Sequence, residues 1–300
     1  MHASVIINPI AGPGRARTMD ACTALARSTL ASHGVTADIH VTEGPDDARR
    51  FAADAARAGA DLVIAWGGDG TVNGAGAALA GTATPLAIIG GGSGNGLARD
   101  LGLPLDAAAA FHVAATGATR TIDAGELNGS LFFNVAGIGL DAGIAARMSQ
   151  PGATRGLLGY VVSTVAEIRG HTPRDYSLVL TGGSGDGQTP IETAALFIAL
   201  ANSRQYGNGA QIAPRALLDD GILDIVVVKP LPFGALVSRV PAFFRGTLRE
   251  DDRVLMRTAT SARISSRGPM GFHVDGEPRV GGETLTLGTR PGILRVRVKR

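Results

Sequence analysis

The chain has 300 residues, 45% of them hydrophobic, which is enough apolar material for about two folded domains. A net charge of +2 without any block of like charges argues against a nucleic-acid partner. The single cysteine, Cys22, excludes an internal disulfide and fits a reducing compartment, and the absence of an apolar run of about 18 residues argues against a membrane-spanning helix.

Strands and helices alternate in the first part of the chain. The predicted strands are the apolar runs 4–7, 35–42, 62–66 and 86–89, and the predicted helices are 15–33, 43–59, 72–79 and 105–116. This alternation is typical of a doubly wound α/β domain with a parallel sheet. Ligands of such sheets bind at the carboxyl ends of the strands, so we expect the loops 8–14, 42–44, 67–71 and 90–96 to form one site.

Two of these loops are rich in glycine. GGDGTVN occupies residues 67–73 after one buried strand, and GGGSGNG occupies residues 90–96 after the next. Closely spaced glycines allow backbone N–H groups to surround an anion, and the helix that follows adds its positive end. Asp69 places a carboxylate in the first loop, which suits a bound Mg²⁺ or a proton transfer. The pattern predicts phosphate binding.

The pattern changes after residue 117 to short β-branched or alternating runs, which are typical of a β-sandwich-like domain. The predicted strands are 119–127, 130–136, 176–180, 192–200, 221–228, 262–266, 272–274 and 283–287, and the predicted helices are 152–169 and 232–249. We expect an α/β nucleotide-binding domain at 1–120 and a β-rich substrate domain at 121–289. The final strand, within 290–300, is left open between the two.

Several common motifs are absent. The chain contains no P-loop, and its six histidines show no metal-binding spacing. GIGLDA at 137–142 approximates a dinucleotide-binding turn, but it lies in the β-rich half, so we expect it to be structural.

Five segments, in order, resemble the diacylglycerol kinase catalytic-domain family, which includes bacterial lipid kinases and the sphingosine and ceramide kinases. They are NPIAG at 8–12, GGDGTVN at 67–73, GGSGNGLARDLGLP at 91–104, the run ending in DGILDIVVV at 206–228, and HVDGEP at 273–278. The resemblance spans most of the chain. It implies an enzyme that transfers phosphate from ATP, with Mg²⁺, to a lipid hydroxyl at a membrane surface.

The resemblance also assigns roles to residues. The implied nucleotide site consists of Asn8, Gly12, Thr42, Gly68, Asp69, Gly70, Thr71, Val72, Asn73 and Ser93. Glu277 is the implied proton acceptor, with Asp69 and Asp275 as the nearby carboxylates, and which of the three is the base stays open. A structural Mg²⁺ is implied at Asp220 and the carbonyl groups of Leu217 and Ile222.

Alternatives remain at this point. The acceptor is open between a diacylglycerol-like lipid and a sphingoid base, and the oligomeric state between a monomer and a homodimer. An NAD kinase also carries a GGDG turn, although DGILD and HVDGEP argue against it. A non-catalytic nucleotide- or lipid-binding module is a third reading, for which Gly74 and Gly96 leave room because the family often has acidic residues there. We expect a cytoplasmic protein, peripheral at the inner membrane face.

Overall fold

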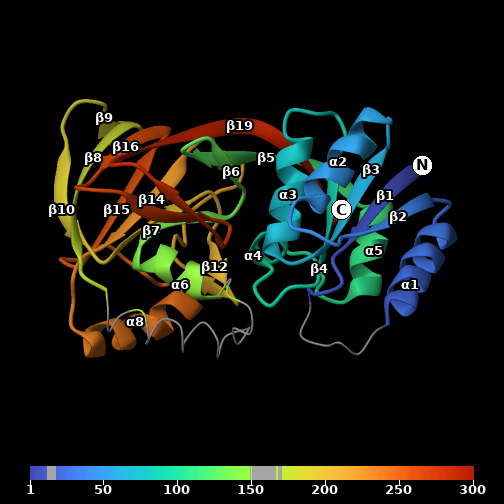
Figure 1. Cartoon of the computed structure of the whole chain (residues 1–300), viewed down its shortest axis with the longest axis horizontal. Coiled ribbons are helices and arrows are strands. Elements are labelled where there is room, and N and C mark those ends of the chain that lie inside the picture. Colours follow the sequence, from blue (N-terminus) through green and yellow to red (C-terminus); the bar gives the residue numbers. More distant parts are fainter. Residues whose placement is uncertain (12–17, 149, 151–166, 168–170) are drawn as a thin grey trace. The chain divides into compact units, whose positions relative to one another are not determined.

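The structure is a computed structural model that describes the chain except for residues 12–17, 149, 151–166 and 168–170 (Figure 1). The chain divides into two compact units: Met1–Ile122 with Gly292–Arg300, and Asp123–Pro291. The predicted helix at 152–169 lies almost wholly outside the described residues, and so does Gly12. Each unit is described by itself below.

The first unit is a parallel sheet with helices on both faces, which confirms the predicted α/β fold. Its strands lie in the order β19–β4–β3–β1–β2, and all pairs are parallel. They are β1 (His2–Ile7), β2 (Thr36–Val41), β3 (Leu62–Gly67), β4 (Leu86–Gly90) and the end of β19 (Thr284–Val298). The helices are α1 (Met19–Ser32), α2 (Asp47–Arg57), α3 (Asp69–Leu79), α4 (Gly96–Asp100) and α5 (Ala107–Thr116).

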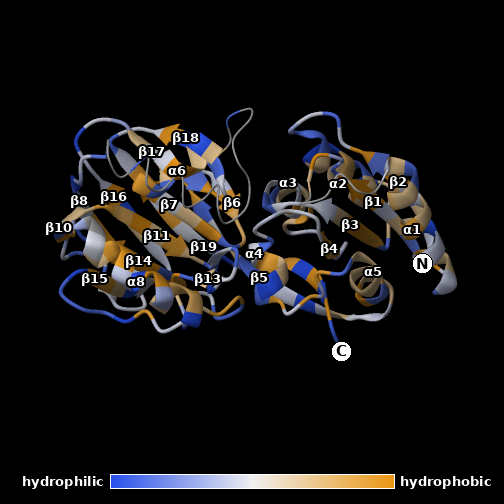
Figure 2. Cartoon of the chain, turned by 90° about the horizontal axis from the view of Figure 1, so that it is seen from below, coloured by the Kyte–Doolittle hydropathy of each residue, from blue (hydrophilic) through white to orange (hydrophobic). Residues whose placement is uncertain are grey.

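Burial explains the apolar runs of the central strands. In β3, residues 62–65 are all buried, and in β4 residues 86–89 are all buried, because helices cover both faces of this sheet. Helices α1 and α5 pack together on one face, and α2 packs against α3. Figure 2 shows the hydrophobic residues along β3. Helix α1 begins later than predicted, at Met19, because the Thr18 side chain accepts the Ala21 N–H and caps it.

The second unit is a β-sandwich, as predicted. Its two antiparallel sheets have the orders β10–β8–β16–β19 and β15–β14–β11–β7–β17–β18, and they enclose a common apolar core. The strands of the first sheet are β8 (Arg174–Gly182), β10 (Ile191–Ala195), β16 (Ser261–Ser265) and β19, joined by β5 (Ala118–Leu127), β6 (Ser130–Phe132) and β9 (Gly185–Asp186). The second sheet contains β7 (Val135–Gly139), β11 (Phe197–Ala201), β14 (Leu223–Val228), β15 (Val254–Ala259), β17 (Met270–Val274) and β18 (Glu277–Gly281).

Within the described residues, two helices cover the outer face of the second sheet. They are α6 (Leu140–Met148) and α8 (Phe233–Arg245), and residues of both pack into a second apolar cluster with β7, β11 and β14. A small hairpin of β12 (Gln205–Gly207) and β13 (Ala210–Gln211) lies beside α8.

Some predicted strands in this unit were wrong in their limits. The single strand predicted at 192–200 is two strands, because the chain leaves the first sheet and enters the second at Leu196. The run is apolar throughout, so no alternation marks that change. Conversely, the runs 283–287 and 293–298 belong to one strand, β19. The elements β15, β18 and α6 were not predicted.

Candidate active site

The turn that joins β3 to α3 contains predicted nucleotide-binding residues. Gly68 is the N-cap of α3, and the amides of Gly70 and Thr71 in its first turn have no acceptor within the helix. A Cβ atom on Gly67 would lie 2.4 Å from Thr71 Oγ1, so only glycine fits there. The turn therefore offers backbone amides and the positive end of α3 to an anion.

The loop after β1 is tied to this turn. Asn8 Nδ2 donates to Thr71 Oγ1 over 3.0 Å, while Asn8 Oδ1 accepts the Ile10 N–H at 3.1 Å. Thr42, which follows β2, is buried and donates its backbone N–H to the carbonyl of Ile7 at 2.9 Å. Predicted site residues from three strand ends thus lie at one edge of the sheet.

Asp69 binds the second glycine loop. Its carboxylate accepts the backbone N–H of Asn95 at 3.0 Å and that of Gly96 at 2.8 Å. Gly94 fits beside it only without a side chain, since a Cβ atom would lie 2.7 Å from Asp69 Oδ2. The role of Asp69 in catalysis stays a prediction. The contacts add a positioning role that sequence reasoning missed, because the carboxylate joins the two glycine loops.

The second glycine loop is compact. A Cβ atom on Gly92 would lie 2.6 Å from Gly68 Cα, so the two loops touch through their backbones. Asn95 has a left-handed backbone, with φ of 51°, and its amide side chain bonds the N–H and the carbonyl of Gly92 at 2.8 and 2.7 Å. Ser93, at the tip, is exposed and has no hydrogen-bond partner among the described residues. Its hydroxyl is available to a ligand.

Two further predicted nucleotide-site residues, Val72 and Asn73, lie within α3 rather than in the glycine loops. Val72 is buried, so its side chain belongs to the core and only its backbone can serve a ligand. Asn73 is half-buried on the next turn of α3.

In the second unit, Asp275 is fixed to the backbone. It lies in the turn between β17 and β18 with a φ of 47°. Its carboxylate accepts the N–H groups of Phe133 at 2.9 Å, Asn134 at 2.9 Å and Val135 at 3.0 Å. These three bonds occupy both oxygens of the carboxylate. The geometry assigns it to holding the turn.

Glu277 begins β18, two residues after Asp275. It is exposed, and its carboxylate has no hydrogen-bond or ion-pair partner in the described part of the chain. Of the three carboxylates that the sequence left open, Glu277 alone keeps its oxygens unused by the surrounding backbone. Its role as the proton acceptor stays a prediction.

A buried pair that sequence reasoning missed supports the same turn. His273 Nε2 lies 2.6 Å from Asp141 Oδ2, and both side chains are buried. The other ring nitrogen, Nδ1, accepts the Gly276 N–H at 3.2 Å. Burial disfavours the charged imidazolium, but the Asp141 carboxylate outweighs this effect and raises the pKa of His273. In the sequence this pair appears only as one histidine in HVDGEP and one aspartate in GIGLDA, which are 132 residues apart.

Gly137 makes room for this pair, and changing it to alanine will disrupt the turn. The added Cβ atom would lie 1.8 Å from Asp141 Oδ2 and 2.5 Å from His273 Nε2. We expect Gly137→Ala to destabilise the protein by about 3 kcal/mol, because it overpacks a buried, hydrogen-bonded pair. Thermal unfolding measures this, with Gly282→Ala as the control, since nothing lies within 4 Å of a Cβ atom there. Equal stability of the two variants would contradict the prediction.

The loop before β14 contains the predicted metal ligands. Asp220 Oδ1 accepts the Ile222 N–H at 3.1 Å. The buried Asp123 holds the loop, because its Oδ2 accepts the Gly221 N–H and its own N–H bonds the Leu218 carbonyl, both at 2.7 Å. The exposed Leu217 lies in the same loop.

The charge of this loop suits a cation. Burial, together with the negative charge of Asp220, raises the pKa of Asp224 to about 6. Carboxylate and carbonyl oxygens are the ligands that a hard divalent ion takes, and metal binding at this loop stays a prediction. Among the described residues, no group of three or more His, Cys, Asp or Glu side chains is placed to bind a metal. A metal here would therefore need backbone carbonyl oxygens as well.

A cavity of about 390 Å³ lies in the second unit, lined by parts of β8, α6, β17 and β18. Its apolar lining includes Ala142, Ala146, Met270, Pro278 and Val280. Pro278 directly follows Glu277 in β18, but Glu277 itself is not among the residues that line the cavity. Arg174, Arg279 and His171 also line it, and the described lining residues include no carboxylate. His171 Nε2 is buried without a hydrogen-bond partner in the described part of the chain.

The chain combines glycine-rich loops on a parallel sheet with a carboxylate-bearing turn on a β-sandwich, and comparison with known proteins identifies this fold as that of lipid kinases. The diacylglycerol kinase catalytic domain matches residues 2–127, and the YegS C-terminal NAD kinase beta sandwich-like domain matches residues 134–298. A diacylglycerol kinase of Mycobacterium tuberculosis is 34% identical over 280 residues, covering 91% of this chain and 88% of that protein.

Two further proteins extend the comparison. A probable lipid kinase YegS-like of Pseudomonas savastanoi is 32% identical, covering 86% of this chain and 83% of the relative. The crystal structure of a putative diacylglycerol kinase from Bacillus anthracis matches with a TM-score of 0.79 and 26% identity, covering 99% of this chain and 96% of the other. The chain belongs to the diacylglycerol kinase catalytic-domain family and is a lipid kinase, as its motifs predicted.

Proposed function

We propose that the chain transfers the γ-phosphate of ATP to the hydroxyl of a diacylglycerol-like lipid. The observation that carries the nucleotide part is the joined pair of glycine loops at 67–71 and 91–96. Their first-turn amides, the Ser93 hydroxyl and the end of α3 supply donors and positive charge for a triphosphate. The Asp69 carboxylate keeps the loops together. Mg²⁺ bound with ATP would neutralise the phosphate charge that develops during transfer.

The acceptor belongs to the second unit in this proposal. Glu277 takes the proton of the lipid hydroxyl, and the hydroxyl oxygen forms a bond to the γ-phosphorus while the bond from the γ-phosphorus to the bridging oxygen breaks and ADP leaves. The Asp275 and His273 contacts keep the turn that carries Glu277 in place. The apolar cavity beside β18 holds the start of the acyl chains. His171 and Arg279 can donate hydrogen bonds to ester carbonyls, whereas Arg174 already donates to the carbonyls of Arg267, Gly268 and Pro269.

Charge favours a glycerolipid over a sphingoid base. The cavity is lined by two arginines, whereas a sphingoid base carries an ammonium group at neutral pH. The Glu167 carboxylate acts electrostatically on His171, and it is ion-paired with Arg147 at 3.3 Å. A neutral diacylglycerol therefore fits better than a cation. Since ATP is the donor, we place the reaction on the cytoplasmic side, at the inner face of a membrane.

Labelled ATP tests this function directly. The protein is incubated with [γ-³²P]ATP, Mg²⁺ and, in separate reactions, dioctanoylglycerol, sphingosine or NAD. We expect label in the glycerolipid and at least tenfold less in the other two. Preferred labelling of sphingosine would overturn the acceptor class, and preferred labelling of NAD would overturn the lipid acceptor. ATP binding without transfer to any acceptor would favour the non-catalytic reading.

We also propose that the loop before β14 binds Mg²⁺ through Asp220 and the carbonyls of Leu217 and Ile222. Mg²⁺ should then raise the Tm by several degrees, because a ligand at about 100 times its Kd stabilises a protein by ~2.7 kcal/mol. Asp220→Asn should abolish this shift. The control is Asp186→Asn. Asp186 also lies in an Asp–Gly turn, but its carboxylate accepts hydrogen bonds from Thr189, and we expect no metal there. An unchanged Mg²⁺ shift in Asp220→Asn would contradict the assignment.

A further inference from the structure

Helix α8 presents an unusual outer surface. One side of the helix packs on the core through Leu236 and Phe243. Val237, Val240 and Phe244 remain 49%, 43% and 41% exposed. Their spacing of three and four residues places them on one face of the helix. We call these three residues the α8 apolar face.

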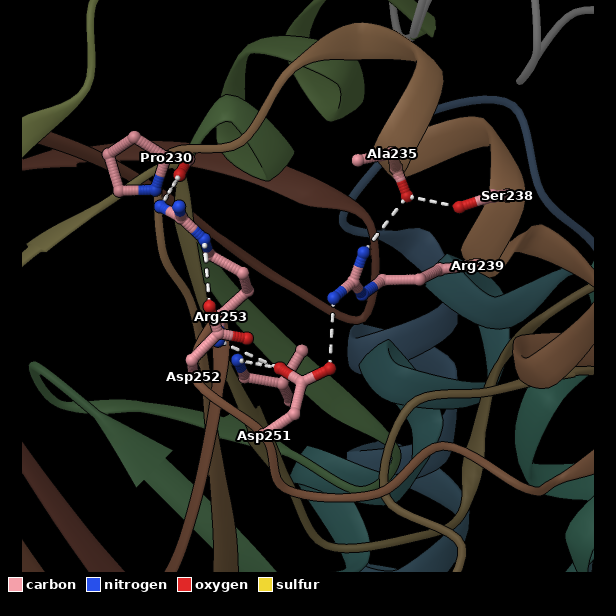
Figure 3. Close-up of polar contacts among 8 residues, drawn as sticks. Pro230, Ala235, Ser238, Arg239, Asp251, Asp252 and Arg253 are labelled. Atoms are coloured by element: carbon pink, nitrogen blue, oxygen red, sulfur yellow. Dashed lines mark hydrogen bonds and ion pairs between the residues drawn. The ribbon is translucent and has the colours of Figure 1, made fainter.

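The charges next to this face are not balanced. Figure 3 shows that Arg239 donates to the Ala235 carbonyl at 3.1 Å and to Asp251 Oδ2 at 2.9 Å. Arg253 bonds the Pro230 carbonyl at 3.0 Å and lies 3.4 Å from Asp252 Oδ2. These contacts neutralise two arginines, and the Arg239–Asp251 pair ties α8 to the loop before β15.

Residues 229–257, which include α8, contain three acidic residues, and the third is also paired, because Glu250 accepts a hydrogen bond from Arg257 at 2.8 Å. Lys229, Arg245 and Arg249 are left with no acidic partner within the described residues. Residues 229–257 therefore hold six cations against three acidic residues, an excess of three positive charges, and Arg245 directly follows Phe244 of the α8 apolar face. An anionic surface with an apolar interior complements both features.

We infer that α8 docks this protein onto bilayers that contain anionic phospholipids. Val237, Val240 and Phe244 enter the boundary between headgroups and acyl chains, and the unpaired cations meet the lipid phosphates. Helix α8 has 13 residues, and no helix in the described part of the chain is long and apolar enough to cross a membrane. The inference deepens the proposed function, since a membrane-bound acceptor requires such contact.

Vesicle co-sedimentation of the full chain tests this inference. The vesicles are phosphatidylcholine alone or phosphatidylcholine with about 30% phosphatidylglycerol. We expect the protein to bind the anionic vesicles at least tenfold more tightly. Val240→Ser/Phe244→Ser should weaken that binding at least tenfold, or about 1.4 kcal/mol. Arg245→Gln/Arg249→Gln should remove the preference for anionic vesicles.

Matched controls separate this surface from general effects. Leu105→Ser removes an exposed apolar side chain of the other unit, and Lys299→Gln/Arg300→Gln removes two exposed cations there. Both should bind vesicles like the unchanged protein. Equal binding by all variants would overturn the inference. So would a concentration-dependent dimer, seen by sedimentation velocity and lost in Val240→Ser/Phe244→Ser, because the face would then be covered by a second copy.

Activity on a dispersed acceptor distinguishes this inference from the proposed function. With dioctanoylglycerol in detergent micelles, Val240→Ser/Phe244→Ser should keep full transfer, and with the same lipid in anionic vesicles it should lose at least tenfold. Transfer reduced equally in both would overturn the docking role. If the unchanged protein phosphorylates no lipid in micelles, the proposed acceptor fails, while the vesicle binding result still decides on docking.

Discussion

Changing Glu277 to glutamine will lower phosphate transfer to lipid by about 10²–10⁴-fold, because a general base contributes this much to a proton transfer. Glutamine has nearly the same shape but cannot take up the proton of the acceptor hydroxyl. Since Glu277 is exposed and its carboxylate has no hydrogen-bond or ion-pair partner among the described residues, the change should leave the Tm and the affinity for ATP unaltered. Initial rates with labelled ATP and dioctanoylglycerol measure the effect.

Glu283→Gln is the matched control for this change. Glu283 Oε1 accepts the Gly268 N–H at 3.0 Å, and the amide oxygen of glutamine can accept it as well. The control thus removes one carboxylate from the same unit and should retain full activity. Transfer by Glu277→Gln within threefold of the unchanged protein would assign proton removal to another group.

Changing Asp69 to alanine will abolish measurable ATP binding and lower transfer by at least about 10³-fold. The change leaves the N–H groups of Asn95 and Gly96 without their acceptor, and each unpaired group costs about 1–3 kcal/mol. The second glycine loop then loses its attachment to the first, so the amides no longer converge on one triphosphate. Isothermal titration with ATP and Mg²⁺ measures the binding.

Asp106→Ala controls for the loss of a carboxylate that caps backbone amides. Asp106 Oδ1 accepts the Ala109 N–H at 2.9 Å at the start of α5, in the same unit. Its removal should cost about 1 kcal/mol of stability and leave ATP binding intact. If Asp69→Ala still binds ATP as tightly as Asp106→Ala, the two loops do not depend on that carboxylate.

The first unit could be predicted well because local and global signals agree there. Its strands are continuous apolar runs, its turns are marked by glycine, and the order of strands and helices allows few topologies. The four strand-end loops could be placed at one edge of the sheet for the same reason. The partners of Asp69 could not be predicted, since its bonds run to backbone amides 26 and 27 residues away, which carry no side-chain signal.

The second unit shows where sequence patterns fail. Residues 195–201 are apolar on both sides, because one sheet face meets the other sheet and the opposite face meets α6 and α8, so the change of sheet at Leu196 had no signature. The pairing of His273 with Asp141 depends on β7 and β17 lying side by side. The pairing of these two strands is set by the tertiary fold, so neither residue alone predicts the contact from the sequence.

A crystal soaked with Mg²⁺ and a non-hydrolysable ATP analogue tests most directly whether the paired glycine loops hold the triphosphate. We predict that the β- and γ-phosphates lie within hydrogen-bonding distance of the amides of Gly70 and Thr71 and of the Ser93 hydroxyl. Phosphates bound away from the loops 67–71 and 91–96, with those amides bonded only to water, would contradict the proposed kinase site.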